Sequence, residues 1–281
     1  MSLLSFWSSL LFCLKSNDSI PSDKHCSQKE VASSEESNIE NRYLLGCQHQ
    51  AHGNFGEAIR SFQSCVTNAP LHVEAHYRLA KIFQQLDKTE EAKIMFKLVI
   101  SLEPNHHLAH FNLGCIYFLQ KKYPISLQYF KRASNINEDD VETWVNLGIV
   151  YFEIGDNESS VEASLEAIKR DKSYEKAFFN LANTYYDMGK YSLAKHCLLQ
   201  AIKMKPDDAD AYFNLGIIYI KEGKTHKAVH CYSKVLKFDP SFVEAKQALA
   251  ELKKKQCVRG NGRNRTFRLE TINELQVADF C

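Results

Sequence analysis

A mostly apolar stretch with an asparagine inside it returns four times along the chain. It reads FNLGCIYF, VNLGIVYF, FNLANTYY and FNLGIIYI, beginning at residues 111, 145, 179 and 213. Apolar side chains around most of the circumference predict a largely buried helix. An unpaired carboxamide in such a setting costs roughly 1 to 3 kcal/mol, so each asparagine should meet water, a structural partner or a ligand.

These stretches are 34 residues apart, and other landmarks keep the same period. Prolines stand at 70, 104, 206 and 240, and an LG or LA pair begins at 45, 79, 113, 147, 181 and 215. Self-similarity at a fixed period indicates stacked helical or strand pairs, none of which buries its apolar face alone. Six repeats are predicted, at 39–72, 73–106, 107–140, 141–174, 175–208 and 209–242.

Each repeat contains two stretches of helical period separated by a break. Gly223 marks the break in the sixth repeat, with counterparts at Gly53, Gly155 and Gly189. Glycine just past a helix end adopts the left-handed conformation without steric cost, so each break predicts a tight turn between two helices. Residues 243–255 restart the first-helix pattern and then turn into lysines, which predicts a capping helix with a polar outer face.

The repeats resemble the tetratricopeptide repeat (TPR) family, and the resemblance covers about three quarters of the chain. The family pattern is a bulky residue, Leu, Gly or Ala, and Tyr on the first helix, then Ala, an aromatic residue, Ala and Pro on the second. The sixth repeat matches it at Tyr212, Leu215, Gly216, Tyr219, Ala228, Tyr232, Val235 and Pro240. The resemblance implies an all-α protein, a right-handed superhelical α-solenoid of six helix pairs plus a C-terminal capping helix.

The fourth repeat departs most from this pattern. Ser160, Ser164 and Lys172 stand at its Ala, aromatic and Pro positions. Small residues at a helix crossing let two helices approach while large ones fill the gaps between them. The second helix of this repeat is therefore expected to be the least tightly packed.

The resemblance also implies a binding surface. In TPR arrays the second, fifth, sixth, ninth, twelfth and thirteenth positions of the first helix face a concave groove. The sixth position holds Asn112, Asn146, Asn180 and Asn214. A carboxamide can bond both the N–H and the C=O of an extended peptide. The four resemble the peptide-holding ladder of long TPR superhelices, including those attached to peptide O-glycosyltransferases; a scaffold role or simple solvation is the alternative.

Other groove positions supply apolar walls and a polar entrance. The apolar candidates are Phe111, Phe118, Phe152, Phe179, Tyr186 and Phe213, and the basic candidates at the entrance are Arg78 and Lys81. TPR domains that clamp the C-terminal carboxylate of chaperones need a lysine at the fifth position. Here that position is Tyr, Phe or Val in every repeat, which excludes this clamp.

Composition and motifs exclude several function classes. With 35 basic and 34 acidic residues, no global field draws the chain to nucleic acid. Nine cysteines without a paired framework favour a reducing compartment. No catalytic or nucleotide-binding motif is present, and the histidines of HHLAH (106–110) and HKAVHC (226–231) lack partners that would complete a metal site. No cofactor, metal, catalytic residue or small-molecule substrate is expected.

The two ends lie outside the repeats. Residues 1–14 are a short apolar segment without a basic region before it, and open alternatives are a signal, a membrane anchor or an undocked end. Residues 15–38 are a polar, Ser-rich linker, and residues 256–281 are a basic tail with a possible short helix.

The sequence thus predicts a non-catalytic cytoplasmic scaffold or adaptor that binds a protein or peptide segment in its concave groove. Two alternatives remain open. The first is a membrane-attached assembly factor that uses residues 1–14, and the second is an accessory subunit of an enzyme complex such as a peptide glycosyltransferase.

Overall fold

The computed structural model describes residues 34–260, and all regular structure in this range is α-helical. The helices belong to two compact units that divide after Met204. The first unit contains α2 (Ser34–Ala51), α3 (Phe55–Asn68), α4 (Val73–Gln85), α5 (Thr89–Leu102), α6 (His107–Leu119), α7 (Tyr123–Ile136), α8 (Val141–Ile154), α9 (Asn157–Arg170), α10 (Glu175–Asp187) and α11 (Tyr191–Met204). The second contains α12 (Ala209–Lys221), α13 (Thr225–Phe238) and α14 (Val243–Gly260).

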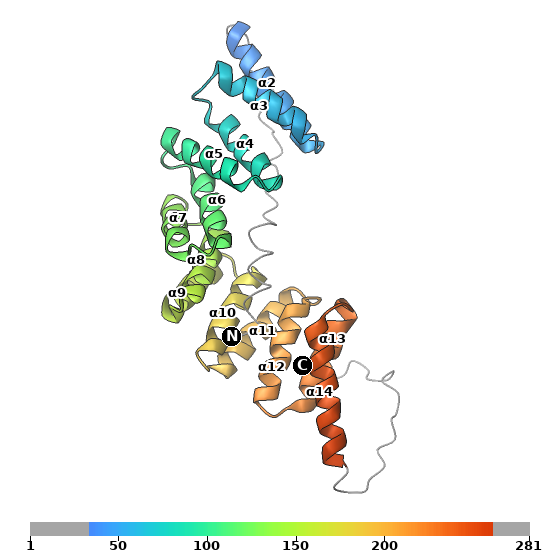
Figure 1. The fold of residues 1–281 in the computed structure, drawn as a ribbon. Coiled ribbons are helices and arrows are strands. Elements are labelled where there is room, and N and C mark those ends of the chain that lie inside the picture. The colour runs from blue at the N-terminus through green and yellow to red at the C-terminus, as the bar shows by residue number, and fades with distance from the viewer. Residues whose placement is uncertain (1–33, 261–281) are drawn as a thin grey trace. The chain divides into compact units, whose positions relative to one another are not determined.

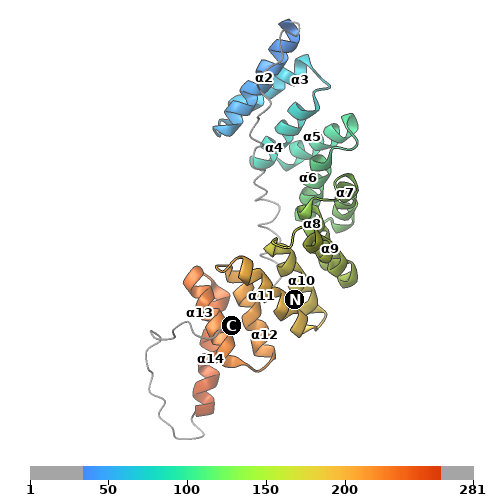
Figure 2. The same cartoon turned by 180° about the vertical axis from the view of Figure 1, so that it is seen from behind.

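The helices follow the period of the sequence. The first helices α4, α6, α8, α10 and α12 begin at 73, 107, 141, 175 and 209, and α14 begins at 243, each the first residue of a predicted repeat or cap. Within the first unit, α4, α6 and α8 lie on one side and α5, α7 and α9 on the other (Figures 1 and 2). The predicted all-α solenoid is confirmed.

The two ends of the described part differ from the predicted boundaries. Helix α2 begins at Ser34, inside the predicted 15–38 linker, and α14 continues to Gly260, inside the predicted 256–281 tail. The apolar segment 1–14 and residues 261–281 lie outside the described residues. Among the described helices, none is long and apolar enough to cross a membrane.

Repeats 1, 3 and 6 are held together where their two helices cross, by a glycine facing a large ring. In the third repeat, a Cβ on Gly114 of α6 would lie 2.8 Å from Cδ1 of Phe130 on α7. In the sixth, a Cβ on Gly216 would lie 2.5 Å from Cε1 of Tyr232. Only a residue with little or no side chain allows this approach, and the ring fills the gap between the helices.

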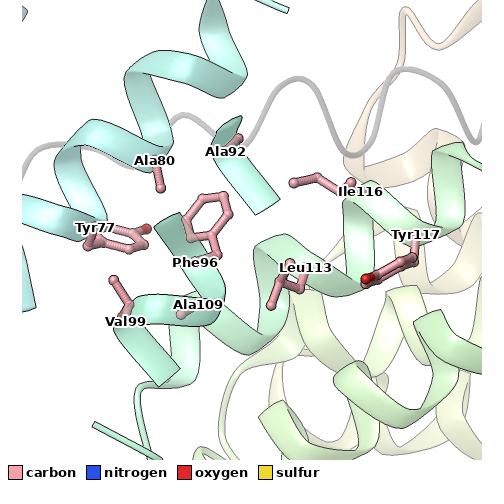
Figure 3. Close-up of a cluster of buried hydrophobic side chains, with 9 residues drawn as sticks. All are labelled: Tyr77, Ala80, Ala92, Phe96, Val99, Ala109, Leu113, Ile116 and Tyr117. Carbon is pink, nitrogen blue, oxygen red and sulfur yellow. The ribbon is translucent and has the colours of Figure 1, made fainter. Parts of the chain in front are cut away.

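The same contact in the second repeat joins it to the third. Phe96 of α5 is fully buried among Tyr77 and Ala80 of α4 and a row of residues from α6 (Figure 3). That row is Ala109, Leu113, Ile116 and Tyr117. Because the ring contacts its own repeat and the next one, the small–large crossing also stacks the repeats.

The turn between the two helices requires a left-handed residue in every repeat. The predicted glycines have φ of 73° (Gly53), 88° (Gly155), 72° (Gly189) and 72° (Gly223), which confirms this part of the sequence analysis. The second and third repeats place Asp87 and Lys121 at the same position, each with φ 57°. A residue with a Cβ is strained there, so these two turns are less favourable than the glycine turns.

Replacing Lys121 with glycine should therefore stabilise the protein. We expect the free energy of unfolding to rise by up to about 1 kcal/mol, because the strain removed exceeds the added entropy of the unfolded chain. Thermal unfolding followed by circular dichroism measures the effect. Gln120→Gly is the matched control, because Gln120 has an ordinary φ of −77° and its replacement should lower stability. Equal effects of the two substitutions would contradict the strain argument.

Candidate functional site

The candidate site is the surface formed by the second, fifth, sixth, ninth, twelfth and thirteenth positions of the first helices in the first unit, called here the first-helix face. Its predicted ladder residues Asn112, Asn146 and Asn180 are buried, with 3%, 4% and 6% exposure. In the second unit, Asn214 is buried as well, with 7% exposure. Buried carboxamides need partners, and the structure supplies them from inside the protein.

Two of the asparagines bond their own helix. Asn112 donates from Nδ2 to the Leu108 carbonyl at 2.7 Å and to the Tyr77 hydroxyl at 3.4 Å. Asn146 donates from Nδ2 to the Glu142 carbonyl at 2.9 Å. Both carbonyl acceptors lie four residues earlier in the helix, and each already accepts the helical N–H and still has a second lone pair. These bonds give the asparagines a structural role, and their use by a ligand remains a prediction.

Asn180 points elsewhere, into the fourth repeat. Its Nδ2 donates to Ser164 Oγ at 2.8 Å, across from α10 to α9. Ser164 is the residue that stands where other repeats have an aromatic ring, and it is fully buried. Nearby, Ser160 Oγ donates to the Gly148 carbonyl at 2.8 Å and lies 2.8 Å from Thr184 Oγ1. Hydrogen bonds thus lie where other repeats have the ring, and the looser packing expected from the sequence stays a prediction.

Removing one of these amides should cost stability. We expect Asn146→Ala to lower the free energy of unfolding by about 1 kcal/mol, because a buried hydrogen bond is lost while the helix is otherwise unchanged. Gln128→Ala is the control, since Gln128 carries the same amide group on the exposed side of α7. Urea unfolding followed by circular dichroism compares the two, and a loss no larger for Asn146 than for Gln128 would contradict a structural role.

Two of the six predicted wall residues, Phe111 and Phe118, are buried, and four of the six contact another aromatic ring. Phe111 makes an edge contact with Phe130 at 5.6 Å between ring centroids, and Phe118 lies 5.6 Å from Tyr123. Tyr186 lies 5.3 Å from Tyr191. In the second unit, Phe213 contacts Tyr232 and Phe242 at 5.5 and 5.0 Å. Four predicted wall residues stay half-buried: Phe152, Phe179, Tyr186 and Phe213.

Two leucines that the sequence analysis did not select are the exposed apolar residues of α6. Leu108 and Leu119 each retain 38% exposure, although every residue between them from 109 to 118 is buried. They occupy the second and thirteenth positions of their helix, which the repeat pattern already assigns to the first-helix face. The position of both leucines in the repeat was the signal in the sequence that could have identified them.

The predicted basic entrance is partly neutralised. Arg78 donates from Nε to Glu74 Oε1 at 2.9 Å, and its side chain keeps 23% exposure. Lys81 is half-buried one turn further along α4. A single pair of this kind contributes modestly to stability, so the basic character of this end of the face is reduced but not abolished.

The histidines of the HHLAH segment have structural partners. Nδ1 of His106 accepts a hydrogen bond from the Ala109 N–H at 3.1 Å and caps α6, while His107 lies 3.3 Å from Asp140 Oδ2. Nε2 of His110 lies 3.0 Å from the Pro104 carbonyl. Within the part of the chain that the structure covers, no three His, Cys, Asp or Glu side chains come together as a metal site.

His110 links this part of the array to pH. Burial lowers the pKa of its ring, and the hydrogen bond to the Pro104 carbonyl opposes that effect only in part. Arg132, His106 and His107 lower the pKa further. Because the folded state prefers the neutral ring, its stabilising contribution is complete above the unfolded pKa of about 6.5 and declines as the pH falls below it.

Acid should therefore destabilise the wild-type protein more than a variant without this ring. We expect His110→Phe to reduce the fall in melting temperature between pH 7.5 and pH 5.5, since Phe178 occupies the same position of repeat 5. His196→Phe is the control, because His196 is exposed on α11. Melting curves across this pH range decide the matter, and identical slopes for wild type and His110→Phe would refute the assignment.

Comparison with known families agrees with the geometry. A family model described as "Tetratricopeptide repeat" matches residues 73–106, 108–140 and 141–174. A second model with that description matches 209–242, and a model described as "TPR repeat" matches 182–223. The chain belongs to the tetratricopeptide repeat family. It is therefore a repeat protein of the kind that serves as a protein-interaction scaffold.

Solved TPR structures share the fold at low sequence identity. Pseudomonas aeruginosa pilF is 16% identical with a TM-score of 0.66, over 77% of this chain and 99% of pilF. YrrB, described as a TPR protein with an unusual peptide-binding site, is 17% identical with a TM-score of 0.56, over 66% of this chain and 96% of YrrB. A chain of the APC/C hetero-tetramer Cut9-Hcn1 is 17% identical with a TM-score of 0.62, and the match covers 78% of this chain but 47% of that one. A search of curated proteins gave no match.

Proposed function

We infer that this TPR protein is a non-catalytic adaptor that holds a segment of a partner protein against its first-helix face. The observation that carries the inference is the pair of exposed leucines at the two ends of α6. Leu108 and Leu119 are eleven residues apart, about three helical turns, and therefore lie on the same side of the helix. Two apolar anchors on one line suit a helix or extended segment with spaced apolar side chains.

Neighbouring repeats extend this face on both sides. In repeat 4, Ile149 and Phe152 are half-buried, and in repeat 5 Phe179 and Tyr186 are. In repeat 2, Arg78 and Lys81 give the face its basic end. A partner segment with apolar anchors and an acidic end fits this order, and the asparagine amides add polar contacts where they can turn towards it.

Two further points support an intracellular adaptor. Among the described residues, Cys65, Cys197 and Cys231 are not in disulfides, as expected in a reducing compartment. YrrB, which shares the fold, is described as binding a peptide. We therefore place the protein in the cytoplasm and assign it a protein or peptide partner, with no reaction of its own.

The adaptor function has a direct test in the partners that the full-length chain retains. We expect proteins captured by the wild-type chain to be lost, with affinity at least tenfold weaker, when Leu108 and Leu119 are both replaced by Glu. In this variant, binding of the partner would bury two carboxylates that have no partner of opposite charge. Quantitative affinity purification with mass spectrometry, followed by titration of the purified partner, measures the change.

The matched control carries two glutamates on the opposite layer. Leu165 of α9 and Leu193 of α11 are 46% and 47% exposed, so Leu165→Glu with Leu193→Glu adds the same charge to leucines that are somewhat more exposed than Leu108 and Leu119. This variant should keep the partners. Retention by the first variant, or loss by both, would place binding away from the first-helix face.

A further inference from the structure

Repeat 4 lacks the large side chain that fills the helix crossing in the other repeats. The eighth residue of the second helix is Phe62, Phe96, Phe130, Leu198 or Tyr232 elsewhere, and each of these is buried. In repeat 4 it is Ser164. The space bounded by Gly148, Ser160 and Ser164, called here the repeat 4 seat, has a ring-sized counterpart in repeats 1, 2, 3 and 6.

A side chain from the next repeat occupies this seat. A Cβ on Gly148 would lie 2.5 Å from Asn180 Nδ2 and 2.9 Å from Ser164 Oγ, so the amide stands where other repeats have an aromatic ring. Helix α10, which carries Asn180, contacts both α9 and α8. The amide is a small, polar substitute for a ring, and it comes from the first-helix face.

Asn180 has a second arrangement available to it. Asn112 and Asn146, at the same position of their helices, donate to the carbonyl four residues earlier. The carbonyl of Lys176 bears the same relation to Asn180. Turning the amide out of the seat therefore exchanges one hydrogen bond for another, and such an exchange costs little.

The polar groups of an emptied seat favour a particular ligand. Ser160 and Thr184 still satisfy each other and the Gly148 carbonyl. Ser164 Oγ loses the Asn180 donor and needs a new one. A phenyl ring would fill the space but leave this buried hydroxyl without its donor, whereas a phenol supplies an O–H.

We propose that the repeat 4 seat binds a tyrosine side chain of a partner segment, with Asn180 as a displaceable lid. The proposal rests on the adaptor function, because the partner segment must lie on the first-helix face for its side chain to reach Asn180. It gives that function a specificity element, a tyrosine placed where the segment crosses between α8 and α10.

The test uses p-cresol, the analogue of a tyrosine side chain, and the full-length chain. Proton–nitrogen correlation NMR spectra recorded during titration with p-cresol should show saturable chemical-shift changes of the Asn180 side-chain amide and of the Gly148 N–H. Asn180→Ala removes the lid and should tighten cresol binding several-fold, while Asn146→Ala, which leaves the seat unchanged, should not. Toluene, which lacks the hydroxyl, should bind at least tenfold more weakly than p-cresol.

A second pair of variants fills the seat from inside the protein. Ser164→Phe restores the ring of repeats 1, 2 and 3 and should reduce cresol binding at least tenfold, whereas Leu165→Phe, on the exposed side of α9, should leave it unchanged. Unaltered binding to Ser164→Phe would overturn the proposal. So would the lack of saturable binding to Asn180→Ala, whether or not Ser164→Phe folds.

The result can be separated from the fate of the adaptor function. If partners are lost from the leucine-to-glutamate variant but cresol does not bind, the adaptor function is supported and the proposal of a tyrosine-binding seat is overturned. If cresol binds as expected while the partners do not depend on the first-helix face, the seat is real but the adaptor surface is not where we place it, and the proposal in its present form is overturned.

Discussion

The contact between a small residue on the first helix and a large one on the second governs this protein. Gly114 and Phe130 show its geometry, with 2.8 Å between the ring and the place of a Cβ. A larger residue at position 114 would force the helices apart, and a smaller one at 130 would leave a cavity. Because Phe96 also contacts the next first helix, one side chain both closes a repeat and stacks it on its neighbour.

The fold could be predicted from the sequence because this contact recurs every 34 residues. The helix starts, the left-handed glycines and the six-fold repetition all follow from spacing, which is local information. The left-handed conformation of Asp87 and Lys121 was not predicted, although both stand at the repeat position that holds glycine in the other repeats. Aspartate and lysine disfavour a left-handed backbone, but the two helices on either side of the turn impose it.

The candidate site was predicted less well, for a physical reason. The position of a residue in the repeat determines which side of the helix it lies on. The exposure of its side chain also depends on the groups around it, such as a nearby hydrogen-bond acceptor. Asn146 bonds its own helix and is buried, while Leu119, the last residue of α6, stays exposed. Sequence pattern identifies the face, and side-chain reach decides which residues on it remain open to a ligand.

Asn180 shows how one substitution in the core can reach the binding face. Had residue 164 been aromatic, as in three of the preceding repeats, the amide of Asn180 would have had no space beside Gly148. With serine there, the amide has a buried acceptor, and α10 contacts α8 as well as α9. The asparagine of repeat 5 is thereby tied to the packing of repeat 4. Its counterparts Asn112 and Asn146 donate to the backbone of their own helices, and Asn112 also donates to the Tyr77 hydroxyl of repeat 2. A partner that bonds these amides would therefore disturb contacts between neighbouring repeats at Asn112 as well as at Asn180.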